Sequence, residues 1–536
     1  MDTKRWFQTV KTINGLATRR PEARTRTIAI VTAGLSLVLP WCVGTSAAVA
    51  QTAAPPAGAA PAVRPAGLLA DNWDVITIQG TRVGFGHTRT ISIKENGRQL
   101  YQTDMLLSMK MKRLGQTVVM KMNMQSVETP GGELVRTRST VALGPTPVVA
   151  VGQVQGDKLQ MRFSSLGKTT TAALPWSQEY RGFFALEQSL KDKPLQPGQR
   201  RQFKALVPVF NQIADVEVVA EDYEETEMLD GRPQRLLKIN AVTSFGIVDV
   251  KSTVWADPQG EVLKMVESSM KQETFRTTRQ VALQDTDAME PDLIVGTLVP
   301  VKGLGDADQA KSARYRVTVA EGQPGKIFPN SATQTTRALQ DGQALITVQR
   351  LRVQKANDID PPAGEKPTAK DREPNNWIQS DNPLVERLAR EVMPDEKNHG
   401  LLAAALERRV HELITEKDFT TALATAAEVA KSRQGDCTEH AVLLAALARA
   451  RGIPARIVVG LVYVEPLGAF GYHMWNEAWI DGAWLPLDAT RGQAGTGVGH
   501  IKLAHSNLNN GVGATAFLPV VQVMGRLEIE VEEVKR

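Results

Sequence analysis

Hydrophobic and polar residues alternate along much of the first half of the chain, from about residue 71 to residue 285. This period of two is typical of strands that bury one face. It is clearest in Met105–Met111 and Val118–Met124, where methionine recurs at every second position or nearly so. Turn sequences separate the runs, at Asn96-Gly97, Pro130-Gly131-Gly132, Asp230-Gly231 and Pro258-Gln259-Gly260. The pattern predicts a large antiparallel β domain over residues 71–285, a curved sheet or half-barrel, with a short helix near Phe183–Leu190.

The next segments are shorter and less regular. Two strand-like runs, Arg314–Val319 and Ala344–Val353, predict a small β or α+β module over residues 286–354. Residues 355–380 are rich in proline and charge, including Asp360-Pro361-Pro362-Ala363-Gly364, and they predict a linker.

Helical spacing dominates from residue 381 onward. Apolar residues recur at helical intervals in Pro383–Val392, Leu401–Thr415 and Thr420–Lys431. Another helix is expected from Cys437 to about Arg451, ended by Gly452 and Pro454. Strands are expected at Ala455–Val464, Tyr472–Ile480 and Ala483–Leu487, the last two joined by the Asp481-Gly482 turn. Helices followed by antiparallel strands predict an α+β domain over residues 381–536.

The first 50 residues have the three parts of an export signal. A basic stretch ends near Arg26, an apolar run spans Ile28–Val43, and Ala48-Val49-Ala50 supplies small residues for cleavage. We expect a cleaved signal peptide over residues 1–50, an Ala/Pro-rich linker over residues 51–70, and a periplasmic or extracellular protein. An uncleaved N-terminal anchor is the alternative, although the run is shorter than the ~20 apolar residues typical of a membrane-spanning helix.

The net charge of +5 changes this picture little. The leader holds seven basic and two acidic residues, so the charges of the remaining chain cancel. We therefore expect no nucleic-acid partner. Membrane contact is expected only through an uncleaved leader.

Candidate chemistry begins at Cys437. Once Cys42 is removed with the leader, Cys437 is the only cysteine, and it is either an inert core residue or a reactive thiol. Asp436 suits an N-cap and Glu439 completes a capping box, so Cys437 occupies the first helical position. Backbone N–H groups and the helix dipole favour a thiolate there, whereas the two carboxylates oppose it. For an oxyanion, the N–H of Cys437 is the first candidate donor and Gln434 the second.

A histidine and an aspartate on the expected hairpin complete the pattern. Counted from the Asp481-Gly482 turn, His473 and Asp488 are nearly level, so their side chains are expected to meet diagonally across the two strands. Taken singly, the first is more often a structural histidine and the second a turn residue. With Cys437 they form a nucleophile, a base and an orienting carboxylate.

Two neighbouring residues have alternative interpretations. His440 is a possible rival base or, with Cys437 and His473, a metal ligand, but a protonated histidine in the first helical turn opposes the dipole. No further Cys/His pair supports zinc and no loop has calcium-ligand spacing, so we expect no metal. Trp475 is a candidate substrate-binding residue, with packing of the hairpin as the alternative.

Four motifs resemble the transglutaminase-like superfamily, in its bacterial exported form. They are Gly-Asp-Cys-Thr-Glu-His at 435–440, Gly-Ile-Pro-Ala-Arg at 452–456, His-Met-Trp-Asn-Glu-Ala-Trp at 473–479 and Trp-Leu-Pro-Leu-Asp-Ala-Thr at 484–490. The likeness covers about residues 382–515. It implies a papain-like fold in which Cys437 is the nucleophile, His473 the general base and acid, and Asp488 the residue that orients His473. Family members often have an aromatic residue after the cysteine, where this chain has Thr438.

These residues predict thiol-dependent acyl transfer on peptide or glutamine amides, without a cofactor. We favour peptidase or amidase hydrolysis of a protein or peptide substrate over transamidation. The alternative from another class is a non-catalytic envelope-binding or scaffold protein, because the β modules occupy more of the chain than the candidate catalytic domain.

Overall fold

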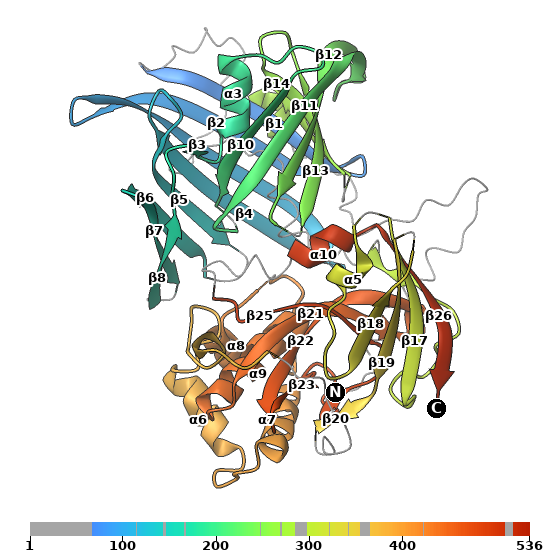
Figure 1. The fold of residues 1–536 in the computed structure, drawn as a ribbon. Helices are drawn as coiled ribbons and strands as arrows, with labels where there is room; N and C mark the ends of the chain where they lie inside the picture. Colours follow the sequence, from blue (N-terminus) through green and yellow to red (C-terminus); the bar gives the residue numbers. More distant parts are fainter. Residues whose placement is uncertain are drawn as a thin grey trace.

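The computed structural model describes residues 67–113, 115–142, 146–165, 168–208, 210–246, 248–268, 271–284, 297–320, 322–340, 342–353, 365–421, 423–509 and 518–536. These residues form an N-terminal antiparallel β domain followed by a C-terminal α+β domain (Figure 1), so the predicted fold class is confirmed. The expected leader, nearly all of the 51–70 linker and the first part of the 355–380 linker lie outside the described residues. Within the described residues, no helix is long and apolar enough to cross a membrane.

The N-terminal domain is built on one curved sheet that contains fifteen strands among the described residues (Figure 1). Consecutive strands pair antiparallel from β1 to β8 and from β10 to β15, and β1 pairs with β15 to join the two runs. β9 pairs parallel with β10 at one edge. The strands are β1 (Leu68–Ile78), β2 (Thr81–Glu95), β3 (Arg98–Arg113), β4 (Gln116–Glu128), β5 (Leu134–Ala142), β6 (Val148–Gln155), β7 (Lys158–Ser165), β8 (Lys168–Pro175), β9 (Tyr180–Arg181), β10 (Arg200–Val207), β11 (Gln212–Glu227), β12 (Pro233–Ser244), β13 (Asp249–Ala256), β14 (Val262–Glu267) and β15 (Gln272–Thr277).

Methionine side chains fill much of the core beneath β3 and β4. Met109 lies opposite Met120 and Met105 opposite Met124 in the register of these two strands. All four are at most 3% exposed, which agrees with the alternating pattern of the sequence. Methionine suits such a core because its unbranched side chain fills irregular gaps. The expected short helix is α3 (Ala185–Asp192), and one further turn of helix is α4 (Arg279–Ala282).

The chain's last strand belongs to the small sheet that precedes the helices. β17 (Ser312–Val319), β18 (Gln334–Ala338), β19 (Gln343–Gln349) and β26 (Leu527–Lys535) form one sheet in the order β18-β19-β17-β26. The expected domains, 286–354 and 381–536, are therefore interlaced: β26 crosses back, β16 (Val299–Pro300) pairs with β22, and β20 (Leu351–Arg352) pairs with β24 (Gly495–Thr496). Periodicity identifies a strand, but it does not reveal a partner so distant in sequence. Two short helices, α5 (Pro324–Ile327) and α10 (Leu518–Val523), accompany this sheet.

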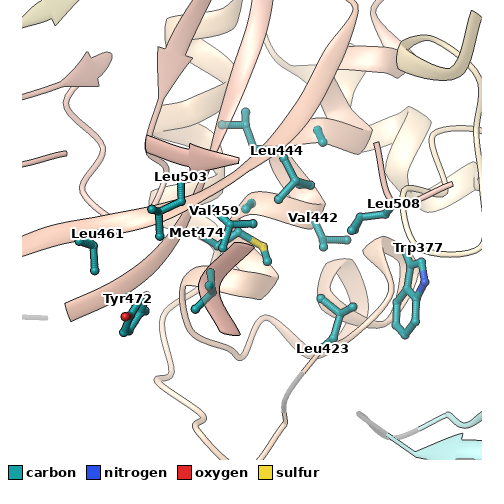
Figure 2. Packing of buried hydrophobic residues seen from close by; sticks show 14 of the residues in the cluster. Trp377, Leu423, Val442, Leu444, Val459, Leu461, Tyr472, Met474, Leu503 and Leu508 are labelled. Carbon is teal, nitrogen blue, oxygen red and sulfur yellow. The ribbon is translucent and has the colours of Figure 1, made fainter. Parts of the chain in front are cut away.

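The remaining elements surround one central helix, α9 (Cys437–Ala450). The others are η3 (Ala369–Asp371), α6 (Pro383–Glu391), α7 (His399–Leu413), α8 (Ala426–Ser432), β21 (Ala455–Val464), η4 (Glu465–Leu467), β22 (Ala469–Ile480), β23 (Ala483–Leu487) and β25 (His500–Ser506). α9 is buried from Thr438 to Arg449, as expected for a helix that is apolar on nearly all sides. Its Val442 and Leu444 pack near Val459 of β21 and Met474 of β22 (Figure 2).

The helix expected at Thr420–Lys431 begins later than its spacing suggested. α8 starts at Ala426 because Thr425 and Glu428 form a capping box: each side chain accepts the backbone N–H of the other residue. The described residues before it, 414–421 and 423–425, lie in a loop. Glu416 of this loop makes a parallel β-bridge with Gln434, which ties the loop to the segment before Cys437.

A buried ion cluster fastens the sheet of the α+β domain. Glu477 of β22 pairs with Arg456 of β21 at 2.7 Å and with Lys502 of β25 at 2.5 Å, and all three side chains are less than 10% exposed. Burial alone would raise the pKa of Glu477, but the charges of Lys502 and Arg456 lower it below its ordinary value. The guanidinium of Arg456 also lies over the ring of Trp484, 4.0 Å from its centroid.

We predict that Glu477→Ala lowers the free energy of unfolding by ~3–5 kcal/mol, because it leaves two buried cations without their shared counter-charge. Urea denaturation measures the loss. Glu532→Ala is the matched control: Glu532 pairs with the more exposed Arg314 and Arg316, and such pairs contribute ~1 kcal/mol or less. Equal losses in the two variants would contradict a structural role for the buried cluster.

Candidate active site

The start of α9 presents the Cys437 thiol at a tightly fixed helix end. The side chain of Asp436 accepts the N–H groups of Thr438 and Glu439, and the side chain of Glu439 accepts the N–H of Asp436. This is the capping box that the sequence predicts. Gly435 precedes it with φ +148°, and a Cβ there would lie 2.3 Å from the Cβ of Glu439. A glycine is therefore needed for the chain to turn so sharply into the helix.

The N–H of Cys437 is available to a substrate. The other amides of the first turn are occupied: those of Thr438 and Glu439 by the Asp436 side chain, and that of His440 by the Asp436 carbonyl. No described group accepts the N–H of Cys437, and the residue is half-buried. An amide at a helix N-terminus beside a nucleophile is suited to receive a developing oxyanion.

His473 and Asp488 meet across the β22–β23 hairpin. The register pairs Asn476 with Leu487, which leaves Asp488 immediately beyond the paired residues and His473 diagonal to it. Nε2 of His473 donates to Oδ2 of Asp488 at 2.9 Å, and the ring lies close enough to Cys437 for the thiol to act on its pKa. Nδ1 is the nitrogen left for the thiol. Burial lowers the pKa of His473, but the charges of Asp488 and Cys437 outweigh it and raise the pKa to about 10.

The carboxylate of Asp488 is fully buried and held by several donors. Oδ2 also accepts Nε2–H of His500 at 3.0 Å, and Oδ1 accepts the N–H of Thr490 at 2.9 Å. Burial would raise the pKa of Asp488, yet its contacts with the two histidines hold it well below the ordinary value. The backbone N–H of Asp488 donates to Glu407 on α7 at 2.8 Å, and burial raises the pKa of Glu407 to about 8. Sequence reasoning identified neither His500 nor Glu407, because no spacing rule connects them to the hairpin.

His473, Asp488 and His500 are also the one group of three side chains, within the described part of the chain, close enough to hold a metal ion. Their hydrogen bonds favour another interpretation. Both histidines direct Nε2 at the same carboxylate oxygen, at 2.9 and 3.0 Å, so these nitrogens act as donors and have no lone pair for a metal. The arrangement orients the ring of His473.

His440 is engaged away from the thiol. Nδ1 donates to the carbonyl of Asp436, and Nε2 accepts from Nζ of Lys417 at 3.3 Å. Burial and the nearby Lys417 lower the pKa of His440 to about 3, so the ring is neutral. Neither nitrogen is free to act as a rival base or to bind a metal.

Gln434 and Trp475 lie near the site but are differently placed. Gln434 is exposed, and its side-chain amide donates to Glu416 at 2.5 Å rather than to any group at Cys437. Trp475 is 3% exposed; its ring stacks beside His473, with centroids 6.2 Å apart, and meets His500 edge-on at 5.4 Å. In this position Trp475 supports the two histidine rings from one side, while its role toward a substrate stays a prediction.

Comparison with known proteins gives one sequence match. Residues 386–489 match the family model of the Transglutaminase-like superfamily, a range that contains Cys437, His473 and Asp488. The search of curated proteins found no match to this chain.

Three solved structures share local similarity with the chain. A candidate cysteine protease from Cytophaga hutchinsonii is 17% identical, with coverage of 42% of this chain and 88% of that one and a TM-score of 0.26. A beta-barrel-like protein of a domain of unknown function from Brucella abortus is 12% identical, with 40% and 97% coverage and a TM-score of 0.29. The periplasmic domain of TgpA from Pseudomonas aeruginosa, bound to ethylmercury, is 17% identical, with 35% and 92% coverage and a TM-score of 0.23. The likeness to this superfamily rests on the sequence match over residues 386–489.

We predict that iodoacetamide alkylates Cys437 rapidly near neutral pH and that His473→Ala slows this reaction about tenfold or more, because the paired imidazolium favours the thiolate. The rate is measured against pH by mass spectrometry of the Cys437 peptide. His399→Ala, an exposed histidine at the start of α7, is the control and should leave the rate unchanged. Equal rates in native protein and His473→Ala would show that the thiol and the ring are not coupled.

Proposed function

Because residues 386–489 form a transglutaminase-like domain, we propose that the chain is a cysteine enzyme that cleaves amide bonds by acyl transfer through Cys437, His473 and Asp488. The observation that carries the proposal is that the ring of His473 lies between Cys437 and Asp488, with a hydrogen bond to the carboxylate, so that a thiol, a proton donor and an orienting carboxylate adjoin one another. The free N–H of Cys437 supports the same chemistry.

Each step of the reaction has a described group to perform it. The Cys437 thiolate attacks the amide carbonyl carbon, and the N–H of Cys437 receives the developing oxyanion. The C–N bond breaks as Nδ1 of the His473 imidazolium gives its proton to the leaving amine, and a thioester forms. Water then attacks the thioester while neutral His473 takes its proton; the C–S bond breaks and the thiolate returns. Asp488 holds the ring of His473 throughout.

We favour hydrolysis of a peptide or protein substrate over transfer to a second amine. Both outcomes share the thioester and differ only in whether water or an amine attacks it. We further propose that the protein is exported, with residues 1–50 as the leader, and that it acts in the periplasm or outside the cell.

The direct test is product analysis with the mature protein and a panel of peptides. Hydrolysis by a peptidase creates new peptide termini, whereas hydrolysis of a glutamine side chain releases ammonia without them and transamidation creates crosslinks. We predict new termini or ammonia, and a loss of at least about a thousandfold in Cys437→Ala, because the nucleophile is gone. Cleavage that persists in Cys437→Ala would exclude this site. A complete lack of products over a broad panel would instead favour the scaffold role.

The pH profile tests the pairing of His473 with Asp488. Activity should fall as pH rises through about 10, because the imidazolium that protonates the leaving amine is then lost. In Asp488→Asn the charge that raises the pKa of His473 is removed, so this upper limb should move to lower pH and the rate should fall about a hundredfold or more. The profile is recorded with any peptide cleaved in the product analysis. An unchanged upper limb in Asp488→Asn would assign that limb to another group.

A further inference from the structure

An arginine from the N-terminal domain reaches the capping residue of the candidate nucleophile. Arg113 ends β3, at the tip of the hairpin that leads into β4. Its Nη2 lies 2.6 Å from Oδ2 of Asp436, the residue immediately before Cys437. The two side chains are 12% and 5% exposed, so the ion pair is shielded from solvent.

The hairpin tip is seated on the loop between α7 and α8. Nη1 of Arg113 donates to the carbonyl of Thr421 at 3.0 Å, and the N–H of Phe419 donates to Oε1 of Gln116 at 2.8 Å. The same loop is tied to the segment before α9, because the N–H of Gly435 donates to the carbonyl of Glu416 at 3.0 Å. One continuous set of contacts therefore connects the N-terminal sheet to the helix end that carries the thiol.

The charges around Cys437 show why this contact matters. Arg113 on β3, Lys417 in the loop and His473 on β22 act electrostatically on Cys437. The other titratable groups near them are Asp418 in the loop, Asp436, Glu439 and His440 on α9 or its cap, and Asp488 after β23. Asp488 is balanced by His473, and His440 is neutral.

Of the two carboxyl groups at the helix start, Asp436 is the one that carries charge at neutral pH. Burial would raise the pKa of Asp436, but Arg113 and the hydrogen bonds of the cap lower it. Burial and the repulsion of Asp436 raise the pKa of Glu439 above its ordinary value, so Glu439 carries less of the negative charge than Asp436 does. Arg113 is the one cation within ion-pair distance of Asp436 among the described residues. Without it, a buried negative charge adjoins the thiolate.

We propose that Arg113 is a positioning residue of the active site: the β3–β4 hairpin delivers its guanidinium to Asp436, and this counter-charge allows the capped helix end to hold Cys437 as a thiolate. The inference rests on the proposed function. It adds that the reactive site is shared between the two halves of the chain, so docking of the N-terminal domain increases the reactivity of the thiol.

The test measures the alkylation of Cys437 by iodoacetamide against pH in the full mature chain. In Arg113→Ala the pH midpoint of alkylation should rise by about one unit and the rate at neutral pH should fall about tenfold, the effect expected for loss of a nearby charge. Arg113→Lys should recover most of the rate, because the cation remains. Lys112→Ala removes one positive charge from the same strand without breaking a described ion pair, and it should behave as native protein.

A double-mutant cycle separates this role from a merely structural one. If Arg113 acts through Asp436, then Arg113→Ala should change the rate less than about threefold in an Asp436→Asn background, where asparagine still caps the helix. An equal tenfold loss in both backgrounds would overturn the proposal. Arg113→Gln serves as a second neutral variant if Arg113→Ala does not fold, since its amide can still donate to the carbonyl of Thr421.

The outcomes also distinguish this inference from the proposed function. A reactive thiol in native protein, with a midpoint that Arg113→Ala and Arg113→Gln leave unchanged, would overturn the role of Arg113 alone. A slow thiol in native protein that does not respond to His473→Ala would overturn both. A midpoint that rises in Arg113→Ala and returns in Arg113→Lys would support both.

Discussion

The active site depends on the burial of one carboxylate, that of Asp488. A buried carboxylate stays charged only when its oxygens accept hydrogen bonds. The oxygens of Asp488 accept from His473, His500 and the N–H of Thr490. Its backbone is held in turn by Glu407, which burial keeps mostly neutral near pH 7. The ring of His473 is therefore fixed between a buried anion and the thiol of Cys437, and only a narrow set of backbone positions for the β22–β23 hairpin satisfies both contacts.

The other end of the site has the opposite electrostatic problem. A capping box fixes the start of α9, but its carboxyl groups disfavour the thiolate that the helix dipole promotes. Two features reduce the conflict: burial and the charge of Asp436 raise the pKa of Glu439, and Asp436 is paired with Arg113. A cation from elsewhere in the fold, Arg113, thus helps to make the strong cap compatible with a reactive thiol, together with Lys417 of the nearby loop and the ring of His473.

What the sequence predicts well is local or carried by neighbouring elements. Alternation identified the N-terminal strands, and the β22–β23 turn was enough to place Asp488 diagonally across from His473. A local sequence pattern does not predict long-range pairing, so neither the pairing of β26 with β17 nor the contact of Arg113 with Asp436 could be predicted. His500 was missed for the same reason: it occupies another strand, with no fixed interval from Asp488. The late start of α8 had a local signal, because the Thr425–Glu428 capping box competes with the apolar spacing that precedes it.

The contact between Arg113 and Asp436 is a single buried ion pair, and its physical character explains how it can be decisive. A buried ion pair adds little net stability, since desolvation of both charges offsets their attraction, but removal of either partner leaves an uncompensated charge. Arg113 and Asp436 thus tolerate few relative positions of the two domains, and the hydrogen bonds of Gln116 and Thr421 define the same position. These contacts fix the position of the β3–β4 hairpin more than they add to the affinity between the domains. That position also determines the charge beside Cys437.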